Sequence, residues 1–217
     1  MKVCIFDLDG TLTDTLEAIA HFGNTALAAN GFKTYEKDCY RAFVGDGRVK
    51  LIERMLESQG ALSDKNYAAV CAAYDAAYEA DPLYKTAAYD GIHELLAALK
   101  ANGVRLAVCS NKPANVVQGV IELVFAPDTF DCVHGVTDGG AVKPDPASAL
   151  EIAEKLGASV SECLFIGDTN VDIFTAKNAG MTSIGVLWGF RDREELEAAG
   201  ADYIISAPNE ILQIAKK

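Results

Sequence analysis

Short apolar runs, each followed by polar residues, recur along the chain. The first covers residues 2–6 and ends directly before Asp7. A run this short and continuous is typical of a strand that is buried on both faces of a parallel sheet. The later runs cover residues 104–109, 163–166, 183–187 and 203–205.

Amphipathic stretches with helical spacing lie between these runs. They cover residues 91–101, 145–156, 172–179, 194–199 and 210–215, and a further helix is expected to start near Pro113. Strands that alternate with helices predict an α/β protein with a doubly wound parallel sheet.

The alternation stops between residues 15 and 82, where the pattern is helical throughout and rich in Ala. Signals that end helices divide this stretch into three or four helices. These signals are Asn30-Gly31, Gly45-Asp46-Gly47, Gly60 and Asp81-Pro82. We therefore expect an inserted helical domain at 15–82 and an α/β core made of 1–14 and 83–217.

The charge of the chain limits the partners that it can have. A formal net charge of -12, with no run of Lys or Arg, disfavours nucleic acid and anionic membrane surfaces. An anionic ligand must therefore be held by a few placed cations, by backbone N–H groups or by a metal. The six cysteines are scattered, no CxxC occurs, and no secretory h-region or membrane-length apolar run is present. We expect buried free thiols and a cytoplasmic location.

Polar residues directly follow several of the predicted strands. Asp7-Leu8-Asp9-Gly10-Thr11 follows the first strand, Ser110-Asn111-Lys112 follows the next, and Gly167–Asp172 follows a later one; Lys143-Pro144 opens the helix before that later strand. Ligands of open α/β sheets bind at the carboxyl ends of the strands. We expect these segments to form one site.

The residue types of this site suit phosphoryl transfer. Carboxylates at Asp7, Asp9, Asp168 and Asp172, with no thiol or imidazole among them, favour Mg²⁺ over zinc. Lys143 and the side chains of Ser110 and Asn111 can contact the oxygens of a phosphoryl group. One carboxylate can attack phosphorus while a second donates a proton to the leaving oxygen and later activates water.

Each motif also has an ordinary structural explanation when it is taken alone. DxDG at residues 7–10 can be an acidic turn, and Lys143-Pro144 a solvated turn. Ser110 and Asn111 can cap the next helix, which is compatible with binding phosphate. Asp172 can favour a helix N-terminus. The four motifs in this order favour chemistry.

Together these motifs resemble those of the haloacid dehalogenase-like hydrolases, and within them the phosphoglycolate phosphatase-like group with a helical cap. The resemblance covers nearly the whole chain and implies a Rossmann-like core. It implies that Asp7 is the nucleophile, Asp9 the general acid/base and Lys143 the lysine that neutralises charge. It also makes Thr11, Ser110 and Asn111 candidates for binding phosphate. Asp7, the Asp9 backbone carbonyl and Asp168, with Asp172 in support, are the implied Mg²⁺ ligands.

The same resemblance identifies residues 15–82 as the cap, and Gly47-Arg48 as part of its specificity loop. An Arg beside flexible glycines is placed to hold a substrate carboxylate, although Arg48 and Lys50 are also ordinary solvated residues. The stretch around Trp188-Gly189 is similar to the C-terminal part of phosphoglycolate phosphatases and related pyrophosphatases. Phosphoglycolate is therefore the first substrate to consider.

Other activities share these residues. Inorganic pyrophosphatase activity stays open, as do activities on sugar phosphates and nucleotides. A hexose-phosphate mutase would want a polar residue just after DGTLTDT, where residues 16–20 offer Glu17 but no His. A phosphate-responsive regulatory module would not need so long a helical insert. We expect a Mg²⁺-dependent phosphatase that acts on a small phosphorylated metabolite and is a monomer or homodimer.

Overall fold

The computed structural model describes residues 1–82, 84–137 and 139–216. The chain forms two compact units: a core unit of Met1–Asp14 and Ala88–Lys217, and a helical unit of Thr15–Ala87. Residue 83, at which we expected the core to resume, lies outside the described residues. Contacts divide the chain after Ala87 instead.

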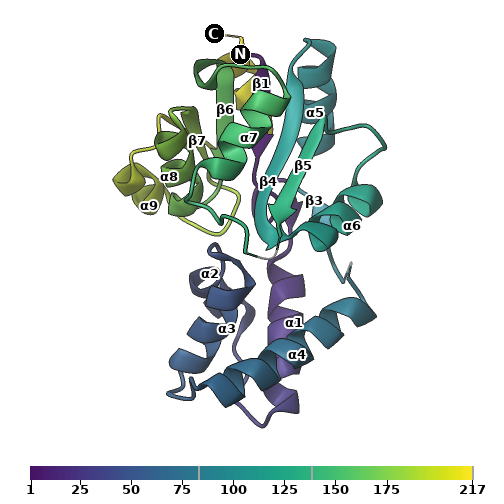
Figure 1. Cartoon of the computed structure of the whole chain (residues 1–217), viewed down its shortest axis with the longest axis vertical. Helices are drawn as coiled ribbons and strands as arrows, with labels where there is room; N and C mark the ends of the chain where they lie inside the picture. The colour runs from purple at the N-terminus through teal and green to yellow at the C-terminus, as the bar shows by residue number, and fades with distance from the viewer. Residues whose placement is uncertain (83, 138, 217) are drawn as a thin grey trace. The chain divides into compact units, whose positions relative to one another are not determined.

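A six-stranded parallel sheet forms the centre of the core unit, with the order β5-β4-β1-β6-β7-β8. The strands are β1 Val3–Phe6, β4 Arg105–Pro113, β5 Cys132–Val136, β6 Cys163–Gly167, β7 Thr182–Val186 and β8 Tyr203–Ile205 (Figure 1). The predicted doubly wound α/β class is confirmed. Chain order changes direction at β1, and ligands of such sheets bind at the carboxyl ends of the strands beside this point.

The strand β5 was not predicted, and β4 runs further than expected. In β5 the half-buried Val133 and His134, followed by Gly135, replace the continuous apolar run that marks the other strands. Its position at the edge of the sheet explains this composition, because an edge strand is less completely covered. Pairing of Pro113 with Val136 extends β4 past an irregularity after Cys109.

Alternate residues of β1 face opposite layers of helices. Cys4 and Phe6 belong to one apolar cluster, and Val3 and Ile5 belong to another. The first cluster includes α5 Ile92–Ala101, α6 Ala114–Val124 and α10 Ile211–Ala215; the second includes α7 Ala147–Lys155 and α8 Asn170–Ala179. Burying a large apolar side chain contributes about 1.5–3 kcal/mol, so this two-sided cover holds the strand ends firmly.

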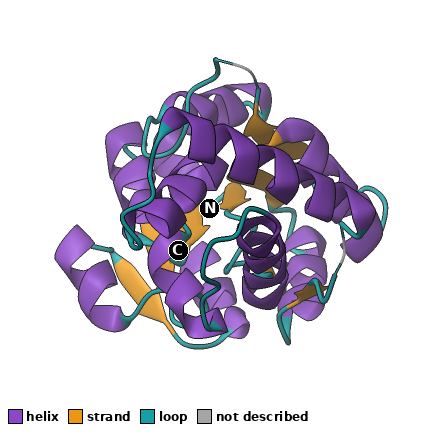
Figure 2. Cartoon of the chain, turned by 90° about the horizontal axis from the view of Figure 1, so that it is seen from below, coloured by secondary structure: helices purple, strands orange, loops and turns teal. Residues whose placement is uncertain are grey.

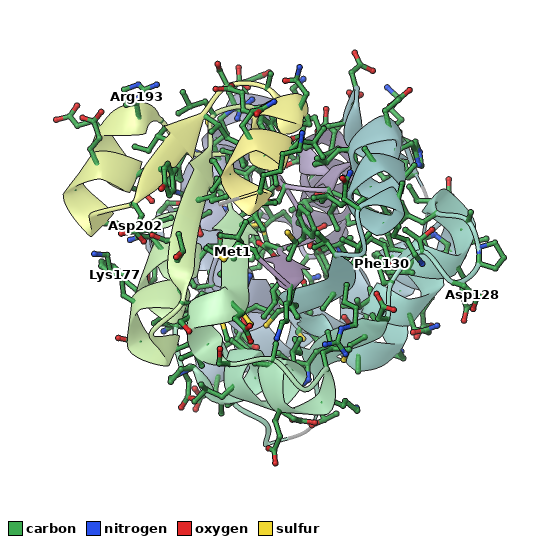
Figure 3. All side chains as sticks on the ribbon, turned by 90° about the horizontal axis from the view of Figure 1, so that it is seen from above. Met1, Asp128, Phe130, Lys177, Arg193 and Asp202 are labelled. Carbon is green, nitrogen blue, oxygen red and sulfur yellow. The ribbon has the colours of Figure 1, made fainter. Side chains whose placement is uncertain are left out.

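The last part of the core unit completes the sheet and brings the chain ends together. Helix α9 Arg193–Ala199 precedes β8, and Lys177, Arg193 and Asp202 lie along this margin of the unit (Figure 3). The Met1 ammonium donates to the carbonyl of Ala215 at 2.7 Å, so the two termini lie side by side.

Helices make up most of the helical unit. They are α1 Leu16–Ala29, α2 Tyr40–Phe43, α3 Gly47–Glu57 and α4 Asp64–Ala80 (Figures 1 and 2). The ring of Phe22 on α1 packs against Tyr74 and Tyr78 on α4, with centroids 6.1 and 5.2 Å away. A side chain at Gly23 would place its Cβ 2.5 Å from the Tyr40 hydroxyl, which explains the glycine. A separate two-stranded sheet is formed by β2 Thr13–Asp14 and β3 Ala87–Ala88.

All six cysteines are free. Cys4, Cys109, Cys132 and Cys163 are buried, but Cys39 is exposed and Cys71 is half-buried. The expectation of buried thiols is therefore wrong for Cys39, which ends the short 3₁₀ turn Lys37–Cys39 of the helical unit. No helix in the described part of the chain has the length and hydropathy that a membrane span requires.

Candidate active site

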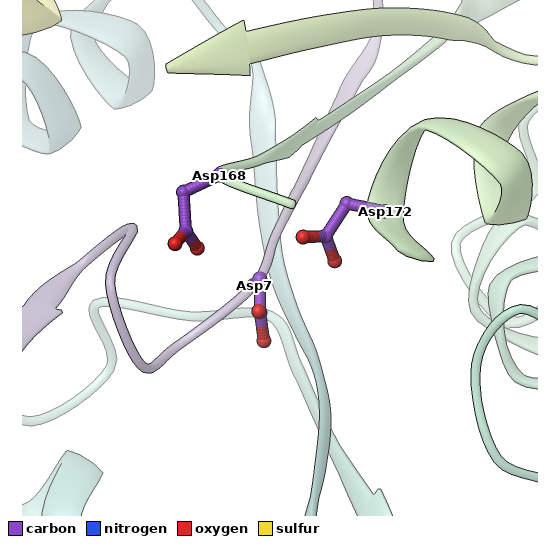
Figure 4. A group of neighbouring side chains, drawn as sticks. All are labelled: Asp7, Asp168 and Asp172. Carbon is purple, nitrogen blue, oxygen red and sulfur yellow. The ribbon is translucent and has the colours of Figure 1, made fainter. Parts of the chain in front are cut away.

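Three carboxylates meet at the carboxyl ends of β1 and β6. Asp7 directly follows β1, and its N–H donates to the Ile166 carbonyl at 2.8 Å, which continues the pairing of the two strands. Asp168 directly follows β6, and Asp172 lies in the first turn of α8. One carboxylate oxygen from each of the three lies within 4.8 Å of the others (Figure 4).

The two oxygens of the Asp7 carboxylate have different surroundings. Oδ1 accepts the N–H of Leu8 at 2.7 Å and lies 2.8 Å from Nζ of Lys143. Among the described residues, Oδ2 has no hydrogen-bond partner. The carboxylate is thus fixed in orientation through one oxygen, while the other is available as a nucleophile.

Lys143 is almost fully buried and bridges two carboxylates. Its side chain is 2% exposed, and Nζ lies 2.8 Å from Asp7 and 2.7 Å from Asp172. Burial by itself lowers the pKa of Lys143, but the charges of Asp172 and Asp7 outweigh burial and raise the pKa above its ordinary value. Lys143 therefore carries a permanent positive charge beside the Asp7 carboxylate.

Asp168 is held by two donors from distant parts of the chain. The Thr11 hydroxyl donates to Oδ1 at 2.9 Å, and the Phe190 N–H donates to Oδ2 at 2.8 Å. Thr11 is fully buried, and the single proton of its hydroxyl is directed at Asp168. The structure thus gives Thr11 a partner other than the phosphate that we expected it to bind.

Asp172 closes the N-terminus of α8 as well as holding Lys143. Its Oδ2 accepts the Thr169 N–H at 3.1 Å and the Thr169 hydroxyl at 2.9 Å. A Cβ on Gly167 would lie 2.1 Å from Cγ of Asp172, so only glycine lets this carboxylate approach the end of β6. Its helix-capping role and its site role therefore coexist.

Burial and mutual repulsion perturb two of the carboxylates. Burial, the charge of Asp172 and, less strongly, that of Asp9 raise the pKa of Asp7 to about 7, although Lys143 opposes this rise. Burial, followed by the charges of Asp172 and Asp7, raises the pKa of Asp168 well above its ordinary value. Carboxylates that resist ionisation together require a cation to be charged together.

These residues fit a hard divalent metal. The three clustered groups offer only oxygen ligands. Burial and neighbouring negative charge raise the pKa of Asp7 and that of Asp168 even with Lys143 present, so a further cation would favour their charged forms. The Asp9 carboxylate is not part of this cluster in the described structure, so a contribution from Asp9 would come through its backbone carbonyl, as the resemblance implies.

Asp9 has a partner that the sequence did not reveal. Nζ of Lys112 lies 2.7 and 2.9 Å from the two carboxylate oxygens of Asp9. Both side chains are largely enclosed, with 16% and 19% exposed. The only sequence signal was the polar segment after Cys109, in which we gave Lys112 no role.

Ser110 and Asn111 lie in the irregular end of β4, rather than after the strand as expected. The Ser110 hydroxyl accepts the Lys112 N–H at 3.2 Å, which leaves its proton for another acceptor. The Asn111 side chain accepts the N–H of Lys143 at 2.7 Å and donates to its carbonyl at 3.1 Å. Asn111 therefore fixes the backbone of Lys143, a role that the motif did not reveal.

Gly47 and Arg48 belong to the helical unit and begin α3. The Arg48 guanidinium forms an ion pair with Asp75 of α4, and the two side chains are 37% and 40% exposed. Lys50 pairs with Glu53 at 2.6 Å. The structure gives both cations protein partners, and their contact with a substrate stays a prediction.

Comparison with known proteins assigns this constellation to a family. The model of the haloacid dehalogenase-like hydrolases matches residues 4–186. The chain belongs to this family. The matched range includes all four sequence motifs.

Relatives of this chain narrow the subgroup. A phosphoglycolate phosphatase of Aquifex aeolicus is 31% identical over 214 residues, which cover 99% of this chain and 96% of the relative. One from Rhodospirillum rubrum is 34% identical over 206 residues, covering 92% and 85%. A crystal structure from Lactobacillus delbrueckii, whose protein is described as a candidate phosphoglycolate phosphatase, has a TM-score of 0.94 and 31% identity, with 99% and 98% coverage. The chain is a phosphatase of the phosphoglycolate phosphatase-like subgroup.

Proposed function

We propose that this phosphatase hydrolyses a small phosphorylated metabolite with Mg²⁺ through an aspartyl-phosphate on Asp7, and that phosphoglycolate is its first candidate substrate. The observation that carries this proposal is the asymmetry of the Asp7 carboxylate. Leu8 and Lys143 hold Oδ1, and Oδ2 has no hydrogen-bond partner among the described residues. A fixed carboxylate with one available oxygen is suited to in-line attack.

In the first step Oδ2 of Asp7 attacks phosphorus, and the bond from phosphorus to the leaving oxygen breaks. Asp9 gives the leaving oxygen its proton. In the second step Asp9 takes a proton from water as the water attacks the aspartyl-phosphate, which releases inorganic phosphate and restores Asp7. Lys143 offsets negative charge beside Asp7 throughout. The Ser110 hydroxyl donates to no other described residue, so its proton is available to a phosphoryl oxygen.

The proposed metal ligands are Asp7, the Asp9 carbonyl, Asp168 and Asp172. A bound Mg²⁺ would supply charge neutralisation for both the phosphate and the carboxylates that attack it. Support for this assignment comes from the oxygen-only cluster and from the raised pKa values of Asp7 and Asp168.

The substrate and the role of the helical unit rest on similarity. Full-length relatives named phosphoglycolate phosphatase support phosphoglycolate, while pyrophosphate, sugar phosphates and nucleotides stay alternatives. We propose residues 15–82 as the cap and keep Gly47 and Arg48 as candidates for contact with the non-phosphate end of the substrate. The free cysteines support the expected reducing compartment, the cytoplasm.

The test is phosphate release from phosphoglycolate, pyrophosphate, hexose phosphates and nucleotides, with Mg²⁺ or with EDTA. Asp7→Asn should abolish release, and Asp38→Asn is the control because the Asp38 side chain is 82% exposed. Acid-quenched protein should carry one phosphoryl group on wild type and none on Asp7→Asn. If Asp7→Asn still releases phosphate, the assignment of Asp7 as the nucleophile is wrong. If the protein prefers another substrate, only the assignment of phosphoglycolate is wrong.

A further inference from the structure

The segment Trp188–Phe190 follows β7 and lies outside the four motifs, yet it contacts two of them. The Phe190 N–H donates to Oδ2 of Asp168 at 2.8 Å. The indole N–H of Trp188 donates to the backbone carbonyl of Thr11 at 3.0 Å. One short loop thus binds the turn after β1 and the carboxylate after β6.

Gly189 lets this loop approach closely. A Cβ at this position would lie 2.2 Å from Cβ of Asp168 and 2.4 Å from the carbonyl oxygen of Gly10. Both neighbours are fixed parts of the site, so they cannot move aside as the tip of a flexible side chain could. Gly10 is under the same constraint, because a Cβ there would lie 2.4 Å from Oδ2 of Asp168.

These contacts leave Asp168 oriented but still able to bind a cation. The Thr11 hydroxyl occupies one lone pair of Oδ1, and the Phe190 N–H occupies one of Oδ2. A carboxylate has about four acceptor positions, so one on each oxygen stays available. Because Trp188 in turn holds the carbonyl of Thr11, both donors to Asp168 depend on the same loop.

We propose that Trp188-Gly189-Phe190 is a positioning element for the metal site, and that it sets the affinity of the Asp168 carboxylate for a divalent cation. This inference rests on the proposed metal dependence, but not on the identity of the substrate. Groups that orient metal ligands typically change metal affinity by roughly 10- to 100-fold when they are altered.

The experiment measures metal binding without substrate, by calorimetry with Mg²⁺ and by the electron paramagnetic resonance signal of free Mn²⁺. Gly189→Ala should raise the dissociation constant roughly 10- to 100-fold. Trp188→Phe, which keeps an aromatic ring but removes the N–H, should raise it by a smaller factor. Gly119→Ala is the matched control, because a Cβ at Gly119 meets no atom within 4 Å.

Activity at increasing Mg²⁺ gives a second readout. If the loop acts through the metal, high Mg²⁺ should restore part of the kcat of Gly189→Ala and Trp188→Phe. Unchanged metal affinity in both folded variants would overturn the proposal. If Gly189→Ala does not fold, the metal affinity of Trp188→Phe alone tests the proposal, and an unchanged affinity would overturn it. A wild type that binds no divalent cation would also overturn it. Metal binding that weakens as expected in a protein inactive on every tested phosphate would uphold the positioning role and reject the proposed substrates.

Discussion

Removing the charge of Asp7 should stabilise the metal-free protein at neutral and alkaline pH, although it removes the nucleophile. Burial is the largest cause that raises the pKa of Asp7 from its ordinary 3.8 to about 7. The folded protein therefore binds the Asp7 proton more tightly than the unfolded chain does. The resulting stability is fully present below about pH 4 and is lost as the pH rises through about 7.

The magnitude follows from the difference between the two pKa values. A difference of about three corresponds to about 4 kcal/mol, which is an upper limit for a group that interacts with Lys143 and Asp172. In Asp7→Asn the amide oxygen can still accept the Leu8 N–H and the Lys143 ammonium. We therefore expect the free energy of unfolding of this variant to be roughly 2–4 kcal/mol higher than that of wild type at pH 8. This difference should shrink toward pH 4.

Urea unfolding in EDTA across this pH range measures the difference. Trp188, the single tryptophan, lies in the core unit with Asp7, so its fluorescence follows the relevant part of the chain. The exposed Asp38→Asn should follow wild type at every pH. Adding Mg²⁺ should then stabilise wild type, by about 2.7 kcal/mol at one hundred times the dissociation constant, and narrow the gap. A variant no more stable than wild type at pH 8 would refute the reasoning, because Lys143 would then fully compensate the Asp7 charge.

Three further substitutions test the contacts of the site. Lys143→Met leaves Asp7 and Asp172 without their buried cation and should lower the free energy of unfolding, measured in urea, by about 3–5 kcal/mol. The control Lys50→Met removes an exposed ion pair and should cause no such loss. Equal losses in the two variants would contradict the stabilising contact of Lys143 with the two carboxylates. Lys112→Met should lower kcat by about 100-fold with little change in KM, since it releases the Asp9 carboxylate. Partial recovery in Lys112→Arg is expected, and a change confined to KM would argue against this role. Asn111→Ala should lower kcat by roughly 10-fold because it frees the Lys143 backbone; unaltered turnover would show that the backbone needs no such hold.

The fold was largely predictable because burial imposes a local pattern. Strands covered on both faces need continuous apolar runs, and β1 and β6 have them. The edge strand β5 was not predicted, because its half-buried residues and its glycine interrupt the apolar run. The prediction that Cys39 is buried was wrong for a related reason. Cys39 lies in a short turn, and whether a turn is exposed depends on the elements that pack around it.

For the candidate site, the polar segments after predicted strands were enough to select Asp7, Ser110 and Asp168 as a group, and Lys143 was added from the segment that precedes a predicted helix. Residues at the carboxyl ends of neighbouring parallel strands converge whatever their separation in the chain. The partner of each side chain was not predictable in the same way. Lys112 entered the sequence argument without a role, and Asn111 entered it only as a phosphate ligand.

The sequence by itself therefore determined the class of fold, the motif residues and the chemistry that carboxylates and lysine can perform. Only the tertiary structure decided that Lys112 pairs with Asp9, that Asn111 holds Lys143 and that Thr11 bonds to Asp168 across 157 positions of the chain. The physical reason is that a sequence pattern reports on residues that are close along the chain, whereas these contacts join residues that are far apart along it. Periodicity reports burial over a few neighbouring residues, whereas a hydrogen bond requires two atoms within about 3 Å, and only the packed sheet sets that distance.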